Sequence, residues 1–169
     1  MLIFRDIISG DELCSDTYKM NTVDDVVYEF DGSTIVVENG ISDALIGGNA
    51  SAEAAMDDVS DSADRTINII HSHRLVETSF DKKSYTSYIK GYMKSILEKL
   101  NETNPQRVSV FKTNVQKYVM NIIKHIDEYR FFTGESMNPE GMVILCNYRE
   151  DQVTPYFVLF KDGLEEEKF

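Results

Sequence analysis

Residues 79–126 read SFDKKSYTSYIKGYMKSILEKLNETNPQRVSVFKTNVQKYVMNIIKHI and set the fold class of the chain. Apolar side chains recur at intervals of three and four over residues 85–100 and again over residues 108–126. That spacing is typical of amphipathic helices with one buried face. The link between the two patterns is short, so the sequence predicts an antiparallel helical hairpin over residues 81–129.

The ends of these helices are marked by their own residues. Asp81 fits an N-cap, and Phe80 and Tyr85 occupy the two positions of a hydrophobic staple around it. Asn104-Pro105 is expected to end the first helix and to cap the second, with proline at the first helical position.

The segments on either side of the hairpin have the composition of strands. Val26–Phe30 and Ser33–Glu38 flank Asp31-Gly32, a dipeptide that favours a type I′ turn, so these runs predict a β-hairpin. Further strands are expected at Met1–Ile8, Thr66–Ile70, Leu75–Phe80, Arg130–Thr133, Met142–Tyr148 and Pro155–Phe160, the last two as a hairpin pair. Strands before and after a helical hairpin indicate an α+β fold with a mostly antiparallel sheet.

Residues 39–65 differ in composition from both parts. They are rich in Gly, Ala, Ser and Asp and contain few large apolar side chains after residue 46. Such a segment buries too little surface to offset its ordering entropy, so it predicts a long, mobile, acidic loop. The length of 169 residues otherwise suits one domain over residues 1–169.

Charge is distributed unevenly along the chain. The net charge is −12 and the pI is about 4.6, yet residues 81–130 hold 10 basic and 5 acidic side chains. An acidic chain repels nucleic acid and anionic membranes, so neither is an expected partner. The first residues, MLIFRDIISGDEL, lack a basic leader and a long apolar stretch, and the two cysteines are far apart. We therefore expect a cytoplasmic protein with reduced thiols and no membrane insertion.

Few motifs for chemistry are present. Gly47-Gly48 lacks the lysine of a phosphate-binding loop, and a flexible corner is favoured there over a ligand-binding loop. His71 and His73 would face the same side of a strand, but no third metal ligand is suggested by spacing. The acidic clusters do not fit an EF-hand, which leaves weak Ca²⁺ binding as the alternative to a solvated acidic surface, and no other cofactor is expected. Because no nucleophile elbow, HExxH motif or activated cysteine motif occurs, we do not expect an enzyme.

The helical hairpin is the best candidate binding element. Basic residues lie off the apolar stripe of its first helix and decorate its second, and we take Lys90, Lys94, Lys112 and Lys117 as the candidate contact residues. A solvated helix face is the simpler interpretation, but the rest of the chain has the opposite sign. A basic surface of this kind attracts acidic proteins at least as well as phosphates.

Several stretches together resemble one family. They are IGGNASAE at 46–53, SFDKKSYTSYIKGYMKSILEKL at 79–100, FFTGESMNPEGMV at 131–143, NYRED at 147–151, TPY at 154–156 and FKDGLEEEK at 160–168. The chain thereby resembles the translationally controlled tumour protein family over its whole length. At one turn it departs from the family pattern, because Gln152 stands where glycine is usual.

The resemblance implies a fold and a set of partners. The fold would be a β-tent, similar to a GTPase-chaperone family (Mss-like), with a protruding helical hairpin and a mobile loop. The implied function is that of a cytoplasmic, growth-associated binding protein, partly attached to the cytoskeleton. Implied partners are tubulin and microtubules, weakly bound calcium, the ribosome and translation elongation factors.

A second implied function is regulation of a Rheb-type small GTPase, by nucleotide exchange or as a chaperone, through Glu12 and a Gly-Glu pair corresponding to Glu135. The signature at 46–53 would contribute the surface residues Gly48, Asn49, Ser51 and Glu53, and we expect its first half to pack against the sheet near Glu12.

Overall fold

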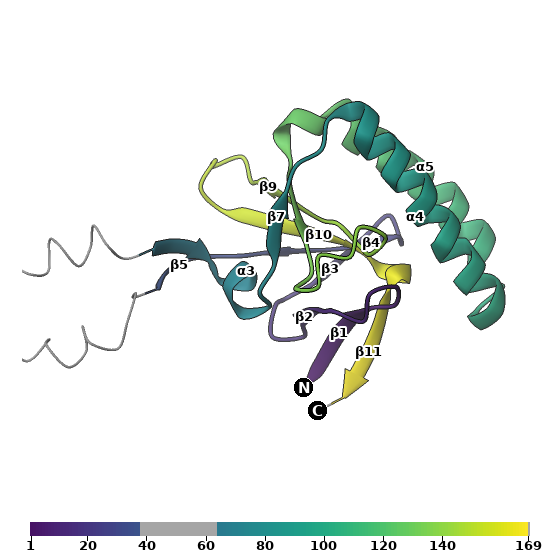
Figure 1. The fold of residues 1–169 in the computed structure, drawn as a ribbon, viewed down its shortest axis with the longest axis horizontal. Coiled ribbons are helices and arrows are strands. Elements are labelled where there is room, and N and C mark those ends of the chain that lie inside the picture. Colours follow the sequence, from purple (N-terminus) through teal and green to yellow (C-terminus); the bar gives the residue numbers. More distant parts are fainter. Residues whose placement is uncertain (38–63, 169) are drawn as a thin grey trace, which may run out of the picture.

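The computed structural model describes residues 1–37 and 64–168, which form antiparallel sheets beside a helical hairpin (Figure 1). The strands are β1 (Leu2–Asp6), β2 (Glu12–Ser15), β3 (Asn21–Val23), β4 (Val27–Asp31), β5 (Thr34–Val37), β6 (Asp64–Ile67), β7 (Val76–Thr78), β8 (Arg130–Thr133), β9 (Ile144–Tyr148), β10 (Pro155–Phe160) and β11 (Leu164–Lys168). The helices are α3 (Asn68–Ser72), α4 (Lys82–Thr103), α5 (Arg107–Lys124) and the 3₁₀ turns η1 (Ile126–Glu128) and η2 (Lys161–Gly163).

The strands are arranged in three sheets. The largest has the order β3-β4-β10-β9-β8-β7, a second has the order β11-β1-β2, and β5 pairs with β6 as a two-stranded ribbon. Leu2 lies opposite Lys168 in the β1–β11 pair, which places the two termini side by side (Figure 1). The α+β class and the predicted pairing of β9 with β10 are both confirmed.

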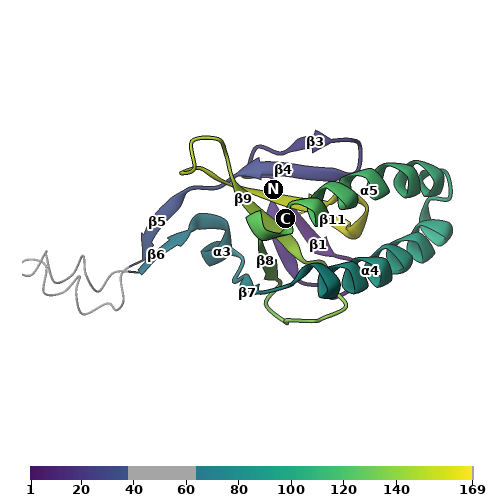
Figure 2. The ribbon, with the colours of Figure 1, turned by 90° about the horizontal axis from the view of Figure 1, so that it is seen from above.

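The predicted helical hairpin is confirmed, and α4 and α5 lie side by side along the sheets (Figure 2). Asp81 caps α4 as expected, since its Oδ1 accepts a hydrogen bond of 2.7 Å from the Ser84 N–H. Phe80 packs edge-on against Tyr85 with ring centroids 5.7 Å apart, which is the expected staple contact. The second helix begins at Arg107, two residues later than predicted, and no side chain caps it.

The core side of α4 holds a row of tyrosines. Tyr85 and Tyr92 are fully buried, and the rings of Tyr88 and Tyr92 are stacked at 5.8 Å. The Tyr88 hydroxyl donates to the Gly141 carbonyl at 2.7 Å and accepts from the Val143 N–H at 2.9 Å. Tyr88 therefore joins α4 to the segment that leads into β9.

The predicted β-hairpin around Asp31-Gly32 is wrong. β4 pairs with β3 and β10, whereas β5 pairs with β6, so the chain crosses from one sheet to another at Gly32. A Cβ at Gly32 would lie 2.9 Å from the ring of Phe157, so this glycine is required for close packing rather than for a turn. The tight turn lies earlier, where Asp24 and Asp25 have φ angles of 53° and 55° between β3 and β4.

The strand predicted over residues 66–70 is also partly wrong. β6 ends at Ile67, and Asn68 begins the short helix α3. The Asn68 Oδ1 accepts hydrogen bonds from the N–H groups of Ser33 and Ile69, at 3.0 and 2.9 Å. The bond to the neighbouring Ile69 N–H is the local kind of contact by which asparagine side chains compete with strand pairing, and the strand ends there.

Three strands had no distinct pattern in the sequence. β2 is almost wholly buried, β3 has three residues, and β11 contains one apolar side chain followed by three glutamates. Each is stabilised by its pairing partner; for β11 this is β1, whose Arg5 forms an ion pair with Glu167.

Two sequence predictions concern residues outside those described. Residues 39–63 of the predicted acidic loop lie outside the described residues, whereas residues 64 and 65 of that prediction lie in β6. The signature residues Gly48, Asn49, Ser51 and Glu53 also lie outside the described part, so the expected packing of the first half of the signature near Glu12 stays a prediction.

Candidate functional site

Glu12 starts β2 and is held by a buried histidine. The Nδ1 of His73, the residue that ends α3, lies 3.0 Å from the Glu12 Oε1. The His73 side chain is only 5% exposed, whereas the Glu12 side chain is 40% exposed. The carboxylate of Glu12 thus reaches solvent while its position is set from the protein interior.

The charge state of His73 follows from this burial. Desolvation lowers the pKa of His73 below its ordinary value, and this effect outweighs the opposite influence of the Glu12 carboxylate. At neutral pH the imidazole is therefore uncharged. An ionised carboxylate only accepts hydrogen bonds. Nδ1 therefore carries the proton of the neutral ring, and its N–H donates a hydrogen bond to Glu12.

The next residue along the chain contacts the second predicted carboxylate. Arg74 has a left-handed backbone with φ 53°, and its Nη1 donates to the Glu135 Oε1 at 3.1 Å. Both side chains are exposed, so this ion pair orients Glu135 but adds little stability.

Asp11 joins the Glu135 loop to the start of β2. Its Oδ2 accepts hydrogen bonds from the Ser136 hydroxyl at 2.6 Å and from the Ser136 N–H at 3.2 Å. A Cβ at Gly134 would lie 2.6 Å from the Asp11 Cβ, so only glycine allows this approach. The structure therefore brings Glu12 and Glu135 to one surface, which we call the carboxylate surface and define as Asp11, Glu12, His73, Arg74 and Glu135.

The four lysines named from the sequence lie on the exposed parts of the hairpin. Lys90 and Lys94 lie one turn apart on the side of α4 opposite its buried residues, and Lys117 lies opposite the buried residues of α5. Lys112 follows the buried Phe111 and therefore flanks the core stripe of α5. All four are exposed, and within residues 1–37 and 64–168 none of them is in an ion pair. We call these four residues the lysine face.

Comparison with known proteins identifies the family. The sequence model of the translationally controlled tumour protein family matches residues 1–165. The chain belongs to the translationally controlled tumour protein family. A homologue from Schistosoma japonicum is 52% identical over the full length of both chains, and one from Mycosarcoma maydis is 55% identical over 99% of each.

Solved structures of the family share the fold. The Schizosaccharomyces pombe protein is 51% identical, covers both chains fully and superposes with a TM-score of 0.83. The Caenorhabditis elegans protein is 34% identical, with all of this chain and 99% of that chain covered, and gives a TM-score of 0.72. The family fold expected from the resemblance is thereby confirmed for the described residues, and none of these family names denotes an enzyme.

The end of the hairpin is anchored to the body of the domain. Arg107 donates to both carboxylate oxygens of Asp162, at 3.0 and 2.7 Å, and to the Asp25 carboxylate at 2.8 Å. Arg107 is thus the exception among the basic hairpin residues, because its side chain is only 17% exposed. These contacts tie the start of α5 to Asp25 and Asp162, so the hairpin is not a free arm.

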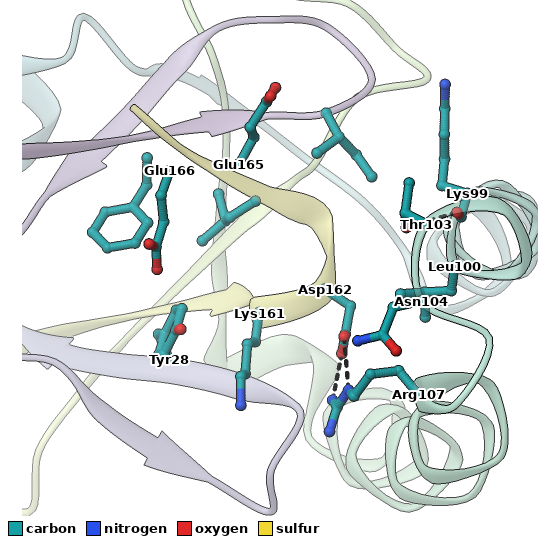
Figure 3. A pocket seen from close by; sticks show the side chains of 13 residues that line it. Tyr28, Lys99, Leu100, Thr103, Asn104, Arg107, Lys161, Asp162, Glu165 and Glu166 are labelled. Atoms are coloured by element: carbon teal, nitrogen blue, oxygen red, sulfur yellow. Dashed lines mark hydrogen bonds and ion pairs between the residues drawn. The ribbon is translucent and has the colours of Figure 1, made fainter. Parts of the chain in front are cut away.

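This anchor closes one end of a groove between the hairpin and β11, with a volume of about 760 Å³ (Figure 3). Lys99 and Leu100 of α4 lie on one side of it, and Glu165 and Glu166 of β11 lie on the other (Figure 3). Charged side chains of both signs line the groove, and two of them, Arg107 and Asp162, are paired with each other.

The candidate metal ligands do not come together. His71 is exposed on α3, whereas His73 points to Glu12, so the expected same-sided pair on a strand is wrong. Within the described ranges, no three His, Cys, Asp or Glu side chains are grouped as metal ligands would be. Asp25 is in ion pairs with Arg107 and Lys161, and the hydrogen bond from Lys161 is the main cause that lowers the pKa of Asp25.

Sequence reasoning named Glu12 and Glu135 from the resemblance but missed the residues that hold them. His73 and Arg74 each contact a carboxylate 61 positions away in the sequence. Asp11 contacts Ser136, 125 positions away, and no local pattern signals such contacts.

None of the described helices is long and apolar enough to cross a membrane.

Proposed function

We propose that this protein binds acidic protein surfaces, with tubulin in microtubules as the first candidate, through its lysine face. The observation that carries the proposal is that Lys90, Lys94, Lys112 and Lys117 are exposed without ion pairs in the described part of the chain. Lysines that are not neutralised by neighbouring carboxylates remain available for a partner.

The rigidity of the hairpin supports this proposal. Two long helices hold the lysines at fixed spacing, and the Arg107 anchor limits movement of the hairpin against the sheets. A preorganised charged surface loses less conformational entropy on binding than flexible side chains on a loop. The attraction should weaken as ionic strength rises, because exposed charges are screened within about 10 Å at 0.1 M salt.

Co-sedimentation with microtubules tests the proposal. The variant with Lys90, Lys94, Lys112 and Lys117 all changed to Glu should stay in the supernatant, and changing the same four residues to Arg should preserve pelleting. A charge-matched comparison uses pairs: Lys90→Glu with Lys94→Glu should weaken binding, while Lys19→Glu with Lys168→Glu, two exposed lysines outside the hairpin, should not. Equal pelleting of the folded fourfold Glu variant and the wild type would exclude the lysine face. The resemblance also implies binding to the translation machinery. Co-sedimentation of the same variants with ribosomes tests that binding.

A second candidate is regulation of a Rheb-type small GTPase by the carboxylate surface. The observation that favours it is that Glu12 and Glu135 lie on one surface and that each is held by its own hydrogen-bond donor. The Glu12 carboxylate, whose donor is uncharged, could attract the basic switch residues or the Mg²⁺ of a GTPase, whereas Glu135 is already paired with Arg74. Purified protein should then accelerate release of a fluorescent GDP analogue from the GTPase, and Glu12→Gln should reduce the effect. A release rate equal to that in buffer would remove this candidate.

A further inference from the structure

We propose that His73 is a positioning residue, which fixes the Glu12 carboxylate for a basic partner surface by donating a hydrogen bond from Nδ1. The proposal rests on the second candidate function, because it assigns the residue that prepares Glu12 for that partner. The supporting geometry is a buried donor 3.0 Å from an exposed acceptor.

The imidazole is the fixed member of this pair. Its ring lies edge-on against Tyr18 with centroids 5.9 Å apart, Tyr18 stacks on Phe30 at 5.3 Å, and Phe30 stacks on Phe157 at 5.8 Å. Phe30 and Phe157 are fully buried residues of the large sheet. The orientation of His73 is therefore determined by the core, and its hydrogen bond transmits that orientation to Glu12.

The same turn also places the second carboxylate. Arg74 follows His73 directly and contacts Glu135, so two consecutive residues hold the two acidic side chains. The left-handed φ of 53° at Arg74 lets the chain turn between these two contacts. A single turn between α3 and β7 thus sets the relative positions of Glu12 and Glu135.

An uncharged donor suits this role. A lysine or arginine in place of His73 would form an ion pair with Glu12 and reduce the negative charge offered to a partner. A neutral imidazole orients the carboxylate and leaves its charge available for a basic side chain of the partner. The partner class that fits is a protein surface with an exposed arginine or lysine.

Two substitutions separate positioning from simple packing. His73→Phe keeps the ring against Tyr18 and removes the donor, whereas His73→Asn loses ring volume and keeps an N–H donor near the place of Nδ1. If His73 positions Glu12, His73→Phe should lower the acceleration of GDP release about tenfold, as expected when a hydrogen bond of about 1.4 kcal/mol is lost, and His73→Asn should retain most of it. The reverse order would show that His73 only fills space and would overturn the proposal.

A measurement without the GTPase keeps the two proposals distinguishable. Nitrogen chemical shifts of the imidazole should show the Nδ1–H tautomer in the wild type, and Glu12→Met should shift His73 toward the Nε2–H tautomer. An Nε2–H tautomer in the wild type would overturn the positioning role whatever the GTPase assay gives. If the wild type shows the Nδ1–H tautomer but no acceleration of GDP release, the regulatory function fails and the hydrogen bond itself stands.

Discussion

Replacing Arg107 by Met should destabilise the domain through the anchor of the helical hairpin. Arg107 forms a bidentate pair with Asp162, whose side chain is only 6% exposed, and a further pair with the half-exposed Asp25. The substitution leaves the Asp162 carboxylate buried without its cation. Such a loss costs about 3–5 kcal/mol, and the lower end applies because Arg107 itself retains some contact with water.

We therefore expect a loss of about 3 kcal/mol in the free energy of unfolding. For a domain of this size that corresponds to a fall in Tm of roughly 6–12 °C. Urea denaturation followed by circular dichroism measures it as a lower midpoint at unchanged slope. The control is Arg74→Met, which breaks an exposed pair with Glu135 and should cost less than about 1 kcal/mol.

A double substitution tests the cause of the loss. Arg107→Met combined with Asp162→Leu removes both members of the buried pair, so no isolated charge remains, and stability should return toward that of the wild type. If Arg107→Met alone costs no more than Arg74→Met, or if the double variant is less stable than the single one, the anchor does not act through the buried charge pair.

Three further predictions concern local features. Gln152 has a left-handed φ of 58°, so Gln152→Gly should raise the free energy of unfolding by about 0.5–1 kcal/mol, measured as an increase in Tm; an unchanged or lower Tm would contradict this. Hydrogen bonds from Ser84 lower the pKa of Asp81 below its ordinary 3.8, so the stabilisation by this cap is complete above pH 3.8 and is lost as the pH falls through the lower folded value. Asp81→Asn should therefore match the wild type at pH 7 and lose less stability in acid, and parallel urea curves at both pH values would refute the assignment. Tyr88→Phe should cost about 1–3 kcal/mol because its hydroxyl joins two backbone groups, whereas Tyr85→Phe should be neutral or stabilising, since the described part of the chain offers its buried hydroxyl no hydrogen-bond partner. Equal unfolding midpoints for these two variants would contradict this distinction.

The helical hairpin was predictable from the sequence because the forces that define it are local. The buried face of α4, its cap at Asp81 and the Phe80–Tyr85 contact all lie within one segment. The strand pair β9–β10 is likewise joined by a short turn. In these segments each local preference agrees with the final structure, which is the condition under which sequence patterns succeed.

The errors arise where tertiary contacts override local preference. Asp31-Gly32 has the composition of a tight turn, but a side chain at Gly32 would collide with Phe157 and Ile67, and the strands before and after it pair in different sheets. β11 has almost no apolar pattern, and it forms a strand because β1 supplies hydrogen bonds and a cation for its glutamates. Neither effect is visible within a window of ten residues.

The two candidate surfaces follow the same division. The exposure of the lysine face was predictable because helical spacing places Lys90, Lys94 and Lys117 away from the buried stripes and Lys112 at the edge of one. Glu12 and Glu135 of the carboxylate surface were named only through the resemblance, and their contacts with His73 and Arg74 were not predictable, because these residues come from separate segments that the fold brings together.

Charge and position argue that these surfaces act independently. One is basic and lies on α4 and α5. The other is predominantly acidic and is formed by the start of β2, the turn after α3 and the loop after β8. In both views α3 lies apart from the hairpin (Figures 1 and 2). Substitutions that share no contacts and lie far apart usually have additive effects. Charge reversal of the lysine face should therefore leave GDP release unchanged, and Glu12→Gln should leave microtubule binding unchanged. Loss of both activities in either folded variant would mean that the two partners compete for one surface or that the hairpin and the sheets move together.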